Sequence, residues 1–426
     1  MSGSLVISLF LFLLATGLPI AVSMGIPSAL YLIMANIPPS QLIMRMVTSL
    51  NSFPMLAVPL FILAAGLMNS SGITERLFEF AKLLVGRMKG GLAQVNIVAS
   101  LIFSGISGAA LADVGGLGNI EIEAMDKQNY PKTHSAAITA ASAVIGPIFP
   151  PSIPLIIYGA AADTSSMRLL IAGIFPAVII AMALMVQVGF LARKYNYPRG
   201  VEKKYSVSEI LTIVKRGLPS MLMPLIMMGG MLSGWFSPTE VAAIAVTYAI
   251  VLSIIYKEMS FKSFFNTCLS TLQSTASVLF IVASAAIFAW VLTVEQLPQQ
   301  ASALMLSISD NPVVLLILAN MILLLAGMFL ESTAAIMVLT PILLPPLMIA
   351  GVNPVHFGLV MVFNLMIGMI TPPVGMSVYM LSPIVGLPVG KVFKAVMPFL
   401  ASLLVALVIL TYIPQISLWL PNLIFS

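Results

Sequence analysis

The sequence is poor in charge: only 8% of its 426 residues are Asp, Glu, Lys or Arg, while 60% are hydrophobic. Soluble globular domains carry roughly a quarter charged residues, so this composition excludes one. Long apolar stretches recur along the whole length, and we therefore expect a polytopic membrane protein. The net charge of +5 then reflects basic loops at a membrane surface and gives no indication of nucleic-acid binding.

Cysteine and histidine are also scarce. The single cysteine, Cys268, excludes a disulfide framework and a cysteine metal cluster. His134 and His356 lie far apart, each after a turn that contains proline, so we expect surface or loop positions and no transition-metal site. The sequence contains no Walker A loop and no nucleophile–base pair. These absences favour neither an ATPase nor any other enzyme.

What the chain does contain is an internal repeat at an offset of 222 residues. Gly105 lies 45 residues before Pro150, and Gly327 lies 45 residues before Pro372. A repeat of this kind in an apolar chain is typical of secondary transporters, which place the substrate between two halves of opposite topology. We therefore expect an all-α polytopic fold built from two inverted-topology repeats.

The distribution of Lys and Arg divides the chain. Seven of them lie in or beside residues 193–216, which we expect to be a cytoplasmic linker between a first repeat, 1–192, and a second repeat, 217–426. No Lys or Arg occurs between Lys262 and Lys391, so loops in that stretch are expected on the exterior.

Each repeat contains a segment whose two flanking loops are alike in their content of Lys and Arg. Residues 91–120 have basic flanks at both ends, and residues 313–350 have flanks without basic residues. Their centres, Ser104–Gly108 and Gly327–Thr333, combine Gly and Ser, which are poor helix centres. We expect two re-entrant helical hairpins with tips at these centres, a geometry allowed only where the backbone is buried in protein or lines a cavity.

After each hairpin we expect a helix broken near the middle of the membrane, over about 135–160 and 357–385. A Pro-Pro pair interrupts each one, and proline removes a backbone donor and clashes with the preceding turn. Freed carbonyls bind a hard cation such as Na⁺, and freed amides at a helix start bind an anion. The candidate sodium-binding residues, acting through backbone or hydroxyl oxygens, are Ser104, Gly105, Ser107, Gly108, Gly146, Pro150, Gly327, Ser332, Thr333, Gly368, Thr371 and Pro372.

Three polar side chains and two prolines complete the candidate site. Acids at membrane depth are costly and indicate function; Glu331 is beside the second tip, and Asp113 follows the first tip, where it either serves coupling or caps a helix. Asn364 either coordinates an ion or bridges helices. No Lys or Arg lies in either hairpin core, so an anionic substrate would rely on helix amides and bound cations. The substrate or coupling candidates are Asp113, Glu331, Asn364, Pro151 and Pro373.

Two other segments leave alternatives open. Ser4–Ile33 is long enough for one tilted helix or two short ones, and Gly17–Pro19 favours two. Ser71–Lys89 has apolar residues at helical spacing among charges, which fits an interfacial helix or a connecting helix packed on its own protein. The whole chain should make about ten crossings besides the hairpins.

At the level of motifs, the sequence resembles the large membrane subunit of tripartite ATP-independent periplasmic (TRAP) transporters. The resemblance covers nearly the whole chain. The motifs that carry it are Ser104–Asp113, Gly146–Pro154, Ile370–Gly375, Gly327–Glu331, Leu339–Leu343, Gly17–Ile20 and Ser237–Glu240.

This resemblance implies import of an organic anion, driven by two or more Na⁺, through an elevator mechanism in a bacterial inner membrane. The substrates implied are carboxylates, such as C4-dicarboxylates or sialic acids, or sulfonates. It also implies a periplasmic substrate-binding protein and a small four-helix membrane subunit, expected as a separate chain because the sequence starts at the large subunit's first helices. There are two alternatives. One is a stand-alone sodium–dicarboxylate symporter. The other is a membrane-embedded enzyme or assembly scaffold, which the absence of a catalytic constellation from the sequence disfavours.

Overall fold

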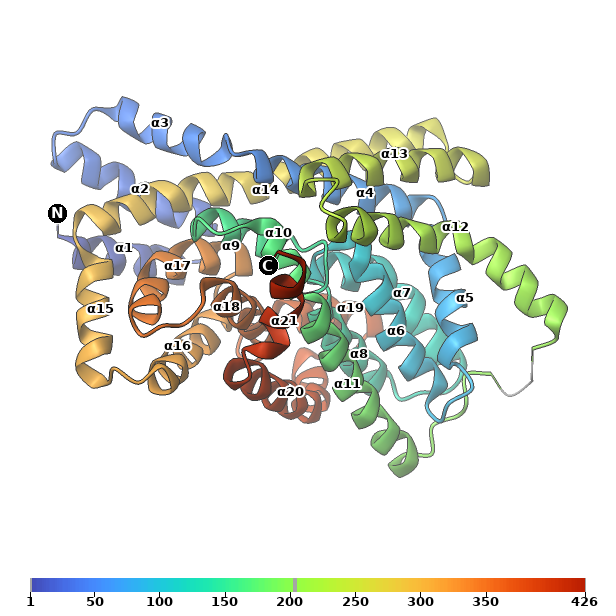
Figure 1. Cartoon of the computed structure of the whole chain (residues 1–426). Coiled ribbons are helices and arrows are strands. Elements are labelled where there is room, and N and C mark those ends of the chain that lie inside the picture. The colour runs from blue at the N-terminus through green and yellow to red at the C-terminus, as the bar shows by residue number, and fades with distance from the viewer. Residues whose placement is uncertain (1, 202–204, 426) are drawn as a thin grey trace.

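The computed structural model describes residues 2–201 and 205–425, and the regular elements in those ranges are helices, apart from one isolated bridge between Lys89 and Arg199. The expected all-α fold is confirmed. The helices form an outer layer along one side of the molecule and an inner bundle beside it (Figure 1).

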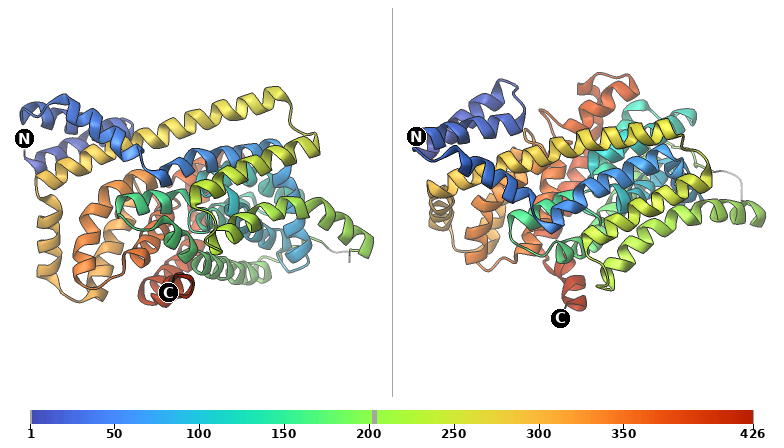
Figure 2. Two further views of the ribbon diagram at one scale, coloured as in Figure 1. Left: turned by 45° about the horizontal axis from the view of Figure 1, so that its top comes forward. Right: turned by 90° about the horizontal axis from the view of Figure 1, so that it is seen from above.

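The outer layer is built around α14, a helix of 34 residues that packs against α2, α3 and α4 and runs along the edge of the molecule (Figure 2). Its elements are α1 (Gly3–Ala15), α2 (Ile20–Met34), α3 (Pro39–Leu50), η1 (Phe53–Leu56), α4 (Ala57–Ser70), α12 (Val207–Leu232), α13 (Pro238–Tyr256) and α14 (Phe261–Val294). The Ser237–Glu240 motif is the capping box that starts α13, because the hydroxyl of Ser237 and the carboxylate of Glu240 each accept a hydrogen bond from the other's backbone amide.

The inner bundle contains both segments that were expected to form hairpins and both that were expected to be broken. Its elements are α6 (Gly91–Ser107), α7 (Ala110–Lys127), α8 (Lys132–Ser142), η2 (Ala143–Ile145), α9 (Ile153–Ala161), α10 (Ser166–Ala172), α11 (Ile174–Lys194), α16 (Pro312–Gly327), α17 (Ser332–Ile349), α18 (Pro354–Gly368), α19 (Met376–Val385), α20 (Val389–Tyr412) and α21 (Gln415–Ile424). The helices α5 (Ile73–Val85) and α15 (Leu297–Ile308) connect the layer to the bundle.

Two units in the bundle have the same order of elements. In the first unit, α6 and α7 form a hairpin that turns at Gly108, and residues 146–152 separate η2 from α9. In the second unit, α16 and α17 form a hairpin that turns at 328–331, and residues 369–375 separate α18 from α19. The Pro-Pro bond in each separating segment is cis. We call α6–α9 the first unit and α16–α19 the second unit.

Several elements differ from the sequence-based expectations. Ser4–Ile33 contains two helices, α1 and α2, as the sequence favoured, whereas the short helices α3 and α15 were not expected. Within the described residues, seven helices are long and apolar enough to cross a membrane, fewer than the ten or so expected. The difference arises because α1, α2 and the halves of the broken helices are each short, and α17, a hairpin arm, is itself among the seven.

The helix α5 packs on its own protein, which supports the connecting-helix interpretation. It lies against α6 and α12 and buries Ile73, Leu77 and Ala81, while Leu84 stays exposed. The expected linker 193–216 is only partly a loop, because α12 already starts at Val207.

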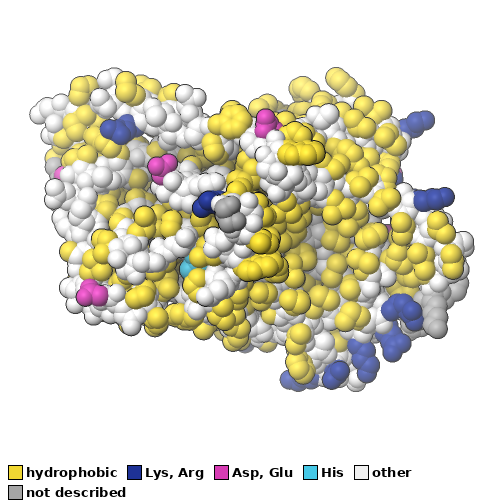
Figure 3. Space-filling model, viewed as in Figure 1, with side chains coloured by type: hydrophobic (Ala, Val, Ile, Leu, Met, Phe, Trp, Pro, Cys, Tyr) yellow, Lys and Arg dark blue, Asp and Glu magenta, His cyan; other side chains and the backbone are white. Residues whose placement is uncertain are grey.

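The basic loops lie together at one end of the molecule. Three hydrogen bonds join them: Gln128 Nε2 to the carbonyl of Gly200 at 2.9 Å, Tyr130 OH to that of Pro198 at 3.2 Å, and the amide of Val201 to the carbonyl of Gly86 at 3.0 Å. Most Lys and Arg side chains visible in Figure 3 gather at this end, where α11 ends and α12 begins. Both flanks of the first hairpin therefore share a surface with the basic segment after α11.

Candidate functional site

The first hairpin tip gathers three predicted site residues around one carboxylate. Asp113, in the first turn of α7, accepts hydrogen bonds from the hydroxyls of Ser107 and, at 3.4 Å, Ser104. All three side chains are buried, with Asp113 only 2% exposed. The cap of α7 is Ala109, and no side chain caps it. Asp113 therefore does not cap this helix, and its carboxyl group lies buried at the tip.

The first tip also touches the break that follows it. Gly108 has a left-handed backbone, with φ of 60°, and its carbonyl accepts a hydrogen bond of 3.2 Å from the amide of Ile153, the first residue of α9. A Cβ at Gly108 would lie 3.1 Å from the carbonyl carbon of Pro151, so only glycine allows this approach. Gly146 lies against the carboxylate of Asp113 from the other side of the break.

The second tip is organised by a carboxylate with a different task. Glu331 is the cap of α17: it accepts hydrogen bonds from the amides of Thr333 at 2.8 Å and Ala334 at 3.3 Å. The hydroxyls of Ser332 and Thr333 donate to its other oxygen at 2.8 and 3.1 Å. The structure thus brings three predicted residues together, but Glu331 already satisfies the backbone of its own helix.

The second break lies against the second hairpin through two glycines. A Cβ added at Gly368 would lie 2.6 Å from the Cα of Gly327, so α16 and α18 meet backbone to backbone. Thr371 donates its hydroxyl to the carbonyl of Ile367 at 2.7 Å, within its own helix end. Of the two prolines, Pro372 is half-buried and Pro373 is exposed, whereas Pro150 and Pro151 are buried.

Asn364 bridges α18 to α16. Its Nδ2 donates to the carbonyl and the side-chain oxygen of Asn320, at 3.1 and 2.6 Å. Its own Oδ1 is buried and has no partner among the described residues. Asn364 therefore bridges the two helices, and coordination of an ion by its amide oxygen stays a prediction.

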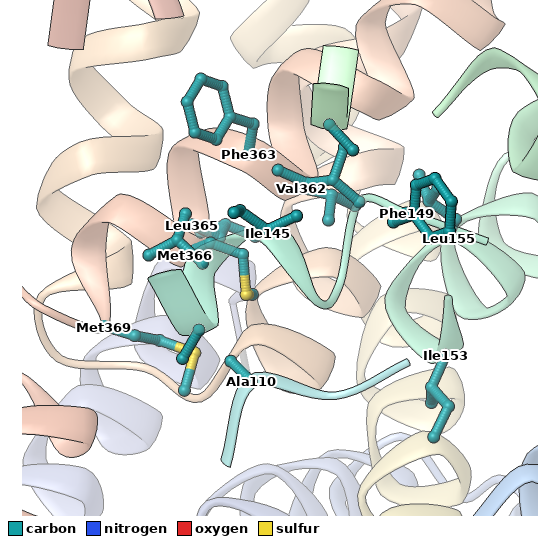
Figure 4. Packing of buried hydrophobic residues seen from close by; sticks show 14 of the residues in the cluster. Ala110, Ile145, Phe149, Ile153, Leu155, Val362, Phe363, Leu365, Met366 and Met369 are labelled. Carbon is teal, nitrogen blue, oxygen red and sulfur yellow. The ribbon is translucent and has the colours of Figure 1, made fainter. Parts of the chain in front are cut away.

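The two breaks meet across an apolar contact. Ile145, just before the first break, lies beside Val362, Leu365 and Met366 of α18 (Figure 4). These four side chains are fully or almost fully buried. The polar groups at each tip are therefore insulated from those of the other unit by packed hydrocarbon.

Comparison with known proteins decides the family. The family model described as DctM, the DctM component of the tripartite ATP-independent periplasmic transporter, matches residues 7–416. The chain belongs to this family. It is a multi-pass membrane component of a transport family and not an enzyme.

Relatives of the DctM component match over almost the full chain. The sialic acid TRAP transporter large permease protein SiaM of Vibrio cholerae serotype O1 is 42% identical over 416 residues, which cover 97% of this chain and 97% of SiaM. The C4-dicarboxylate TRAP transporter large permease protein DctM of Pseudomonas aeruginosa is 38% identical over 403 residues, which cover 94% of both chains. Among solved structures, the YdaH transporter of Alcanivorax borkumensis aligns with a TM-score of 0.64 over 88% of both chains, at 17% identity, and so shares the fold.

Two cavities flank the inner bundle. One, of about 750 Å³, lies between the outer layer and the α9–α10 connection; besides apolar residues it is lined by Asp163 and by hydroxyl side chains, those of Thr48, Ser49, Ser52, Thr164, Ser165, Ser166, Ser237 and Thr239. The other, of about 1010 Å³, lies at the basic end and contains Arg76 and Glu258. Arg76 Nη2 lies 2.6 Å from Glu258 Oε1, and this hydrogen bond lowers the pKa of Glu258, which lies in the loop after α13.

One functional candidate was missed in the sequence analysis. Glu121 is 1% exposed in α7, eight residues or about two turns beyond Asp113 and so on the same face of the helix. That spacing of two acids is a signal that the sequence carried, but Glu121 fell just outside the predicted hairpin. The expectation of a surface or loop position is wrong for His356, which is buried in α18 with both ring nitrogens hydrogen-bonded, to Ser417 and to the carbonyl of Thr411.

Proposed function

We propose that this chain is the large permease subunit of a TRAP transporter that imports an organic anion, coupled to Na⁺. The observation that carries the proposal is the doubled arrangement of a hairpin tip against a broken helix, with buried oxygen groups at each tip. Family membership supplies the transport class, and the geometry supplies the candidate ion sites.

Two ion sites fit the two units. At the first tip, Asp113, Ser104 and Ser107 supply a carboxylate and two hydroxyls beside the backbone at Gly108. At the second, Thr371 and the unpartnered Oδ1 of Asn364 lie on the helix end that meets Gly327. A hard cation selects such oxygen ligands, so two or more Na⁺ are the coupling ions we propose.

A carboxylate is the substrate class best supported. The two relatives above are named for sialic acid and for C4-dicarboxylates, which share a carboxylate group. The described hairpin tips hold no Lys or Arg, so the anion would be held by the starts of α9 and α19 and by the bound cations, whereas the carboxylate of Glu331 already caps α17. Pro151 and Pro373 precede two of these helix starts and would shape the substrate pocket.

We further propose inverted topology for the two repeats, re-entrant entry of both hairpins, and an elevator motion of the inner bundle against the outer layer. The separation of the helices into a layer and a bundle supports this division. A bacterial inner membrane, a periplasmic substrate-binding protein and a small four-helix membrane subunit in a separate chain complete the proposal, as the word tripartite in the family description suggests.

Reconstituted uptake tests the proposal. The chain is placed in liposomes with its small subunit, and uptake of labelled sialic acid and of labelled succinate is measured with and without the loaded binding protein and with Na⁺ or K⁺ outside. We expect uptake of one anion only when Na⁺ and the binding protein are both present. Uptake without the binding protein would instead favour the stand-alone sodium–dicarboxylate symporter.

Cysteine labelling tests the inverted topology. Lys127→Cys and Asp310→Cys, in a background that lacks Cys268, place single thiols on exposed ends of the first and second units. A membrane-impermeant maleimide should label them from opposite faces of the membrane. Labelling of both from the same face would refute inverted repeats while leaving the family assignment intact.

A further inference from the structure

A second buried carboxyl lies inside the first hairpin, away from the proposed ion sites. The Oε2 of Glu121 accepts a hydrogen bond of 2.7 Å from Asn96 Nδ2 and lies 3.4 Å from the hydroxyl of Thr139. Its Oε1 is buried and has no partner among the described residues. Half of this carboxyl is thus unsatisfied, in a side chain that is only 1% exposed.

No positive charge in the described part of the chain faces Glu121. The helix α7 packs against α4, α5, α6, α8, η2 and α19. Of these, α4, α6 and η2 contain no charged residue, and the only titratable group of α19 is the exposed Tyr379. On α5 and α8, and on α7 itself, each basic side chain has another partner: Arg76 pairs with Glu258, Lys82 with Glu79, Lys127 with Glu123, Lys132 with Asp126, and His134 contacts Tyr197.

The other ionisable groups near α7 are themselves acids or lie at its exposed end. Glu75 on α5 faces the cavity at the basic end, and Glu123 and Asp126 are exposed. Asp113 is buried and belongs to the same polar interior of the hairpin, which continues from Asn96 through Ser142 and Ser100. An ionised Glu121 would therefore be a buried charge without a counter-charge, which costs several kcal/mol.

A metal cation does not fit this place as well as a proton does. The Oδ1 of Asn96 already accepts a hydrogen bond from Ser142 at 2.6 Å, and the hydroxyl of Thr139 accepts one from Asn96 Nδ2 at 2.7 Å. The surrounding segments are continuous helix, whose carbonyls are engaged in helical hydrogen bonds. A hard cation requires a shell of several oxygens, whereas a proton requires one lone pair.

We propose that Glu121 is a proton-binding site, and that the first hairpin carries this side chain as the neutral acid. The bound proton removes the uncompensated charge from the hairpin interior. Once a cation is bound at the proposed tip site, the bound proton also leaves Asp113 as the only carboxylate buried in the unit, because two like charges in one interior oppose each other. In this respect the site supports the cation proposed at the tip, a role that rests on the proposed function, whereas proton binding itself does not.

Infrared spectroscopy of the purified chain in sodium-free D₂O buffer reads this proton directly. Glu121→Gln keeps the shape of the side chain and its acceptor for Asn96; Glu123→Gln is the matched control on the same helix, at an exposed position. At neutral pH we expect a C=O band of a neutral carboxylic acid that loses intensity in Glu121→Gln and keeps its intensity in Glu123→Gln. The same neutral-acid band in both variants and the parent would overturn the proposal.

A second variant keeps the test decisive if Glu121→Gln does not fold. Asp113→Asn retains Glu121, so its spectrum should still contain the neutral-acid band at neutral pH; only a carboxylate band there would overturn the proposal. Where Glu121→Gln folds, thermal unfolding gives another readout. The parent and Glu123→Gln should lose stability as the pH rises above the ordinary carboxyl range, because the unfolded chain then ionises at residue 121 while the folded chain keeps the proton. Glu121→Gln should lose less, and equal pH dependence in all three would contradict proton binding at this residue.

Discussion

In the first unit Asp113 and Glu121 place two carboxyls in the protein interior, whereas the positions 222 residues later are Ala335 and Leu343, which are equally buried. The polar partners differ in the same way, since Thr139 corresponds to Met361. The second unit keeps its carboxylate, Glu331, at the tip, where it caps a helix. The backbone plan is therefore repeated, but the ionisable interior is not.

This difference indicates that the two units have different functional roles although their backbone geometry is similar. Exposed helix ends occur twice, so both units can hold an ion or an anion through the backbone. Buried carboxyl groups occur in the first unit alone among the described residues. We therefore expect substitutions in the first unit to change the response to Na⁺ and protons, and substitutions in the second to change mainly stability.

The largest expected effect concerns the glycines at the two breaks. Gly368→Ala forces two backbones apart, since the new Cβ would lie 2.6 Å from the Cα of Gly327, and should destabilise the chain by about 3 kcal/mol. Gly146→Ala meets the movable carboxylate of Asp113 and should cost only about 1 kcal/mol. Thermal unfolding midpoints in detergent measure both. Gly390→Ala, where no atom lies within 4 Å, is the control, and equal losses at the two breaks would contradict the contrast.

The second prediction compares the two tip carboxylates. Asp113→Asn removes the only charge at the first tip, so the Na⁺ concentration for half-maximal uptake should rise more than tenfold, equivalent to about 1.4 kcal/mol. Glu331→Gln should change it less than threefold, because the amide oxygen still accepts from Thr333 and Ala334. Asp310→Asn, in the loop before α16, controls for general charge effects. A larger shift in Glu331→Gln would reverse the assignment of the two units.

Hydroxyl removal gives a smaller effect. Ser107→Ala and Thr371→Ala should each raise the Na⁺ concentration for half-maximal uptake at near-normal expression, because backbone ligands remain in place. We expect the larger increase for Ser107, whose hydroxyl binds Asp113. Thr247→Ala is a matched control for Thr371, since it removes the same hydroxyl-to-carbonyl bond from the exposed face of α13. Unchanged sodium curves in both variants would make these hydroxyls packing groups.

The smallest expected effect concerns how the first unit is tied to the outer layer. Arg76 on α5 pairs with Glu258, and this hydrogen bond lowers the pKa of Glu258 in the folded state. The pair therefore contributes at neutral pH, and its contribution is lost as the pH falls through that lowered pKa. Because Glu258 is 44% exposed, the loss should stay below about 0.5 kcal/mol. Unfolding midpoints of the parent and Glu258→Gln should thus converge on acidification; a constant difference would contradict this.

Local signals predicted the parts of the fold that local chemistry determines. The Pro-Pro pairs and the Ser-Gly tip identified where helices stop, because proline and glycine act on their own backbone. The length of α14 was not predicted, because its first half contains the polar residues Asn266, Thr271 and Gln273, and such residues are typical of loops. The burial of His356 was missed as well, because it depends on α21 folding back to supply Ser417.

The candidate site was predictable as a set of regions and less so as a set of contacts. Ser107 and Asp113 meet because the chain reverses at Gly108, and Gly327 meets Gly368 because α16 packs on α18. The environment of Glu121 draws on three helices whose contributing residues lie far apart in sequence. Hydrophobic periodicity along the sequence does not show which helices pack together, so the hydrogen bonds of Glu121 could not be predicted from it.

The length of α14 has a consequence for the surrounding bilayer. Its 34 residues, at about 1.5 Å per residue, extend well beyond a hydrocarbon core of about 30 Å. A helix of this length spans the core only by tilting or by extending past it. Such hydrophobic mismatch costs fractions of a kcal/mol per Å. The acyl-chain length of the host membrane therefore affects α14, the same helix that packs against the second hairpin.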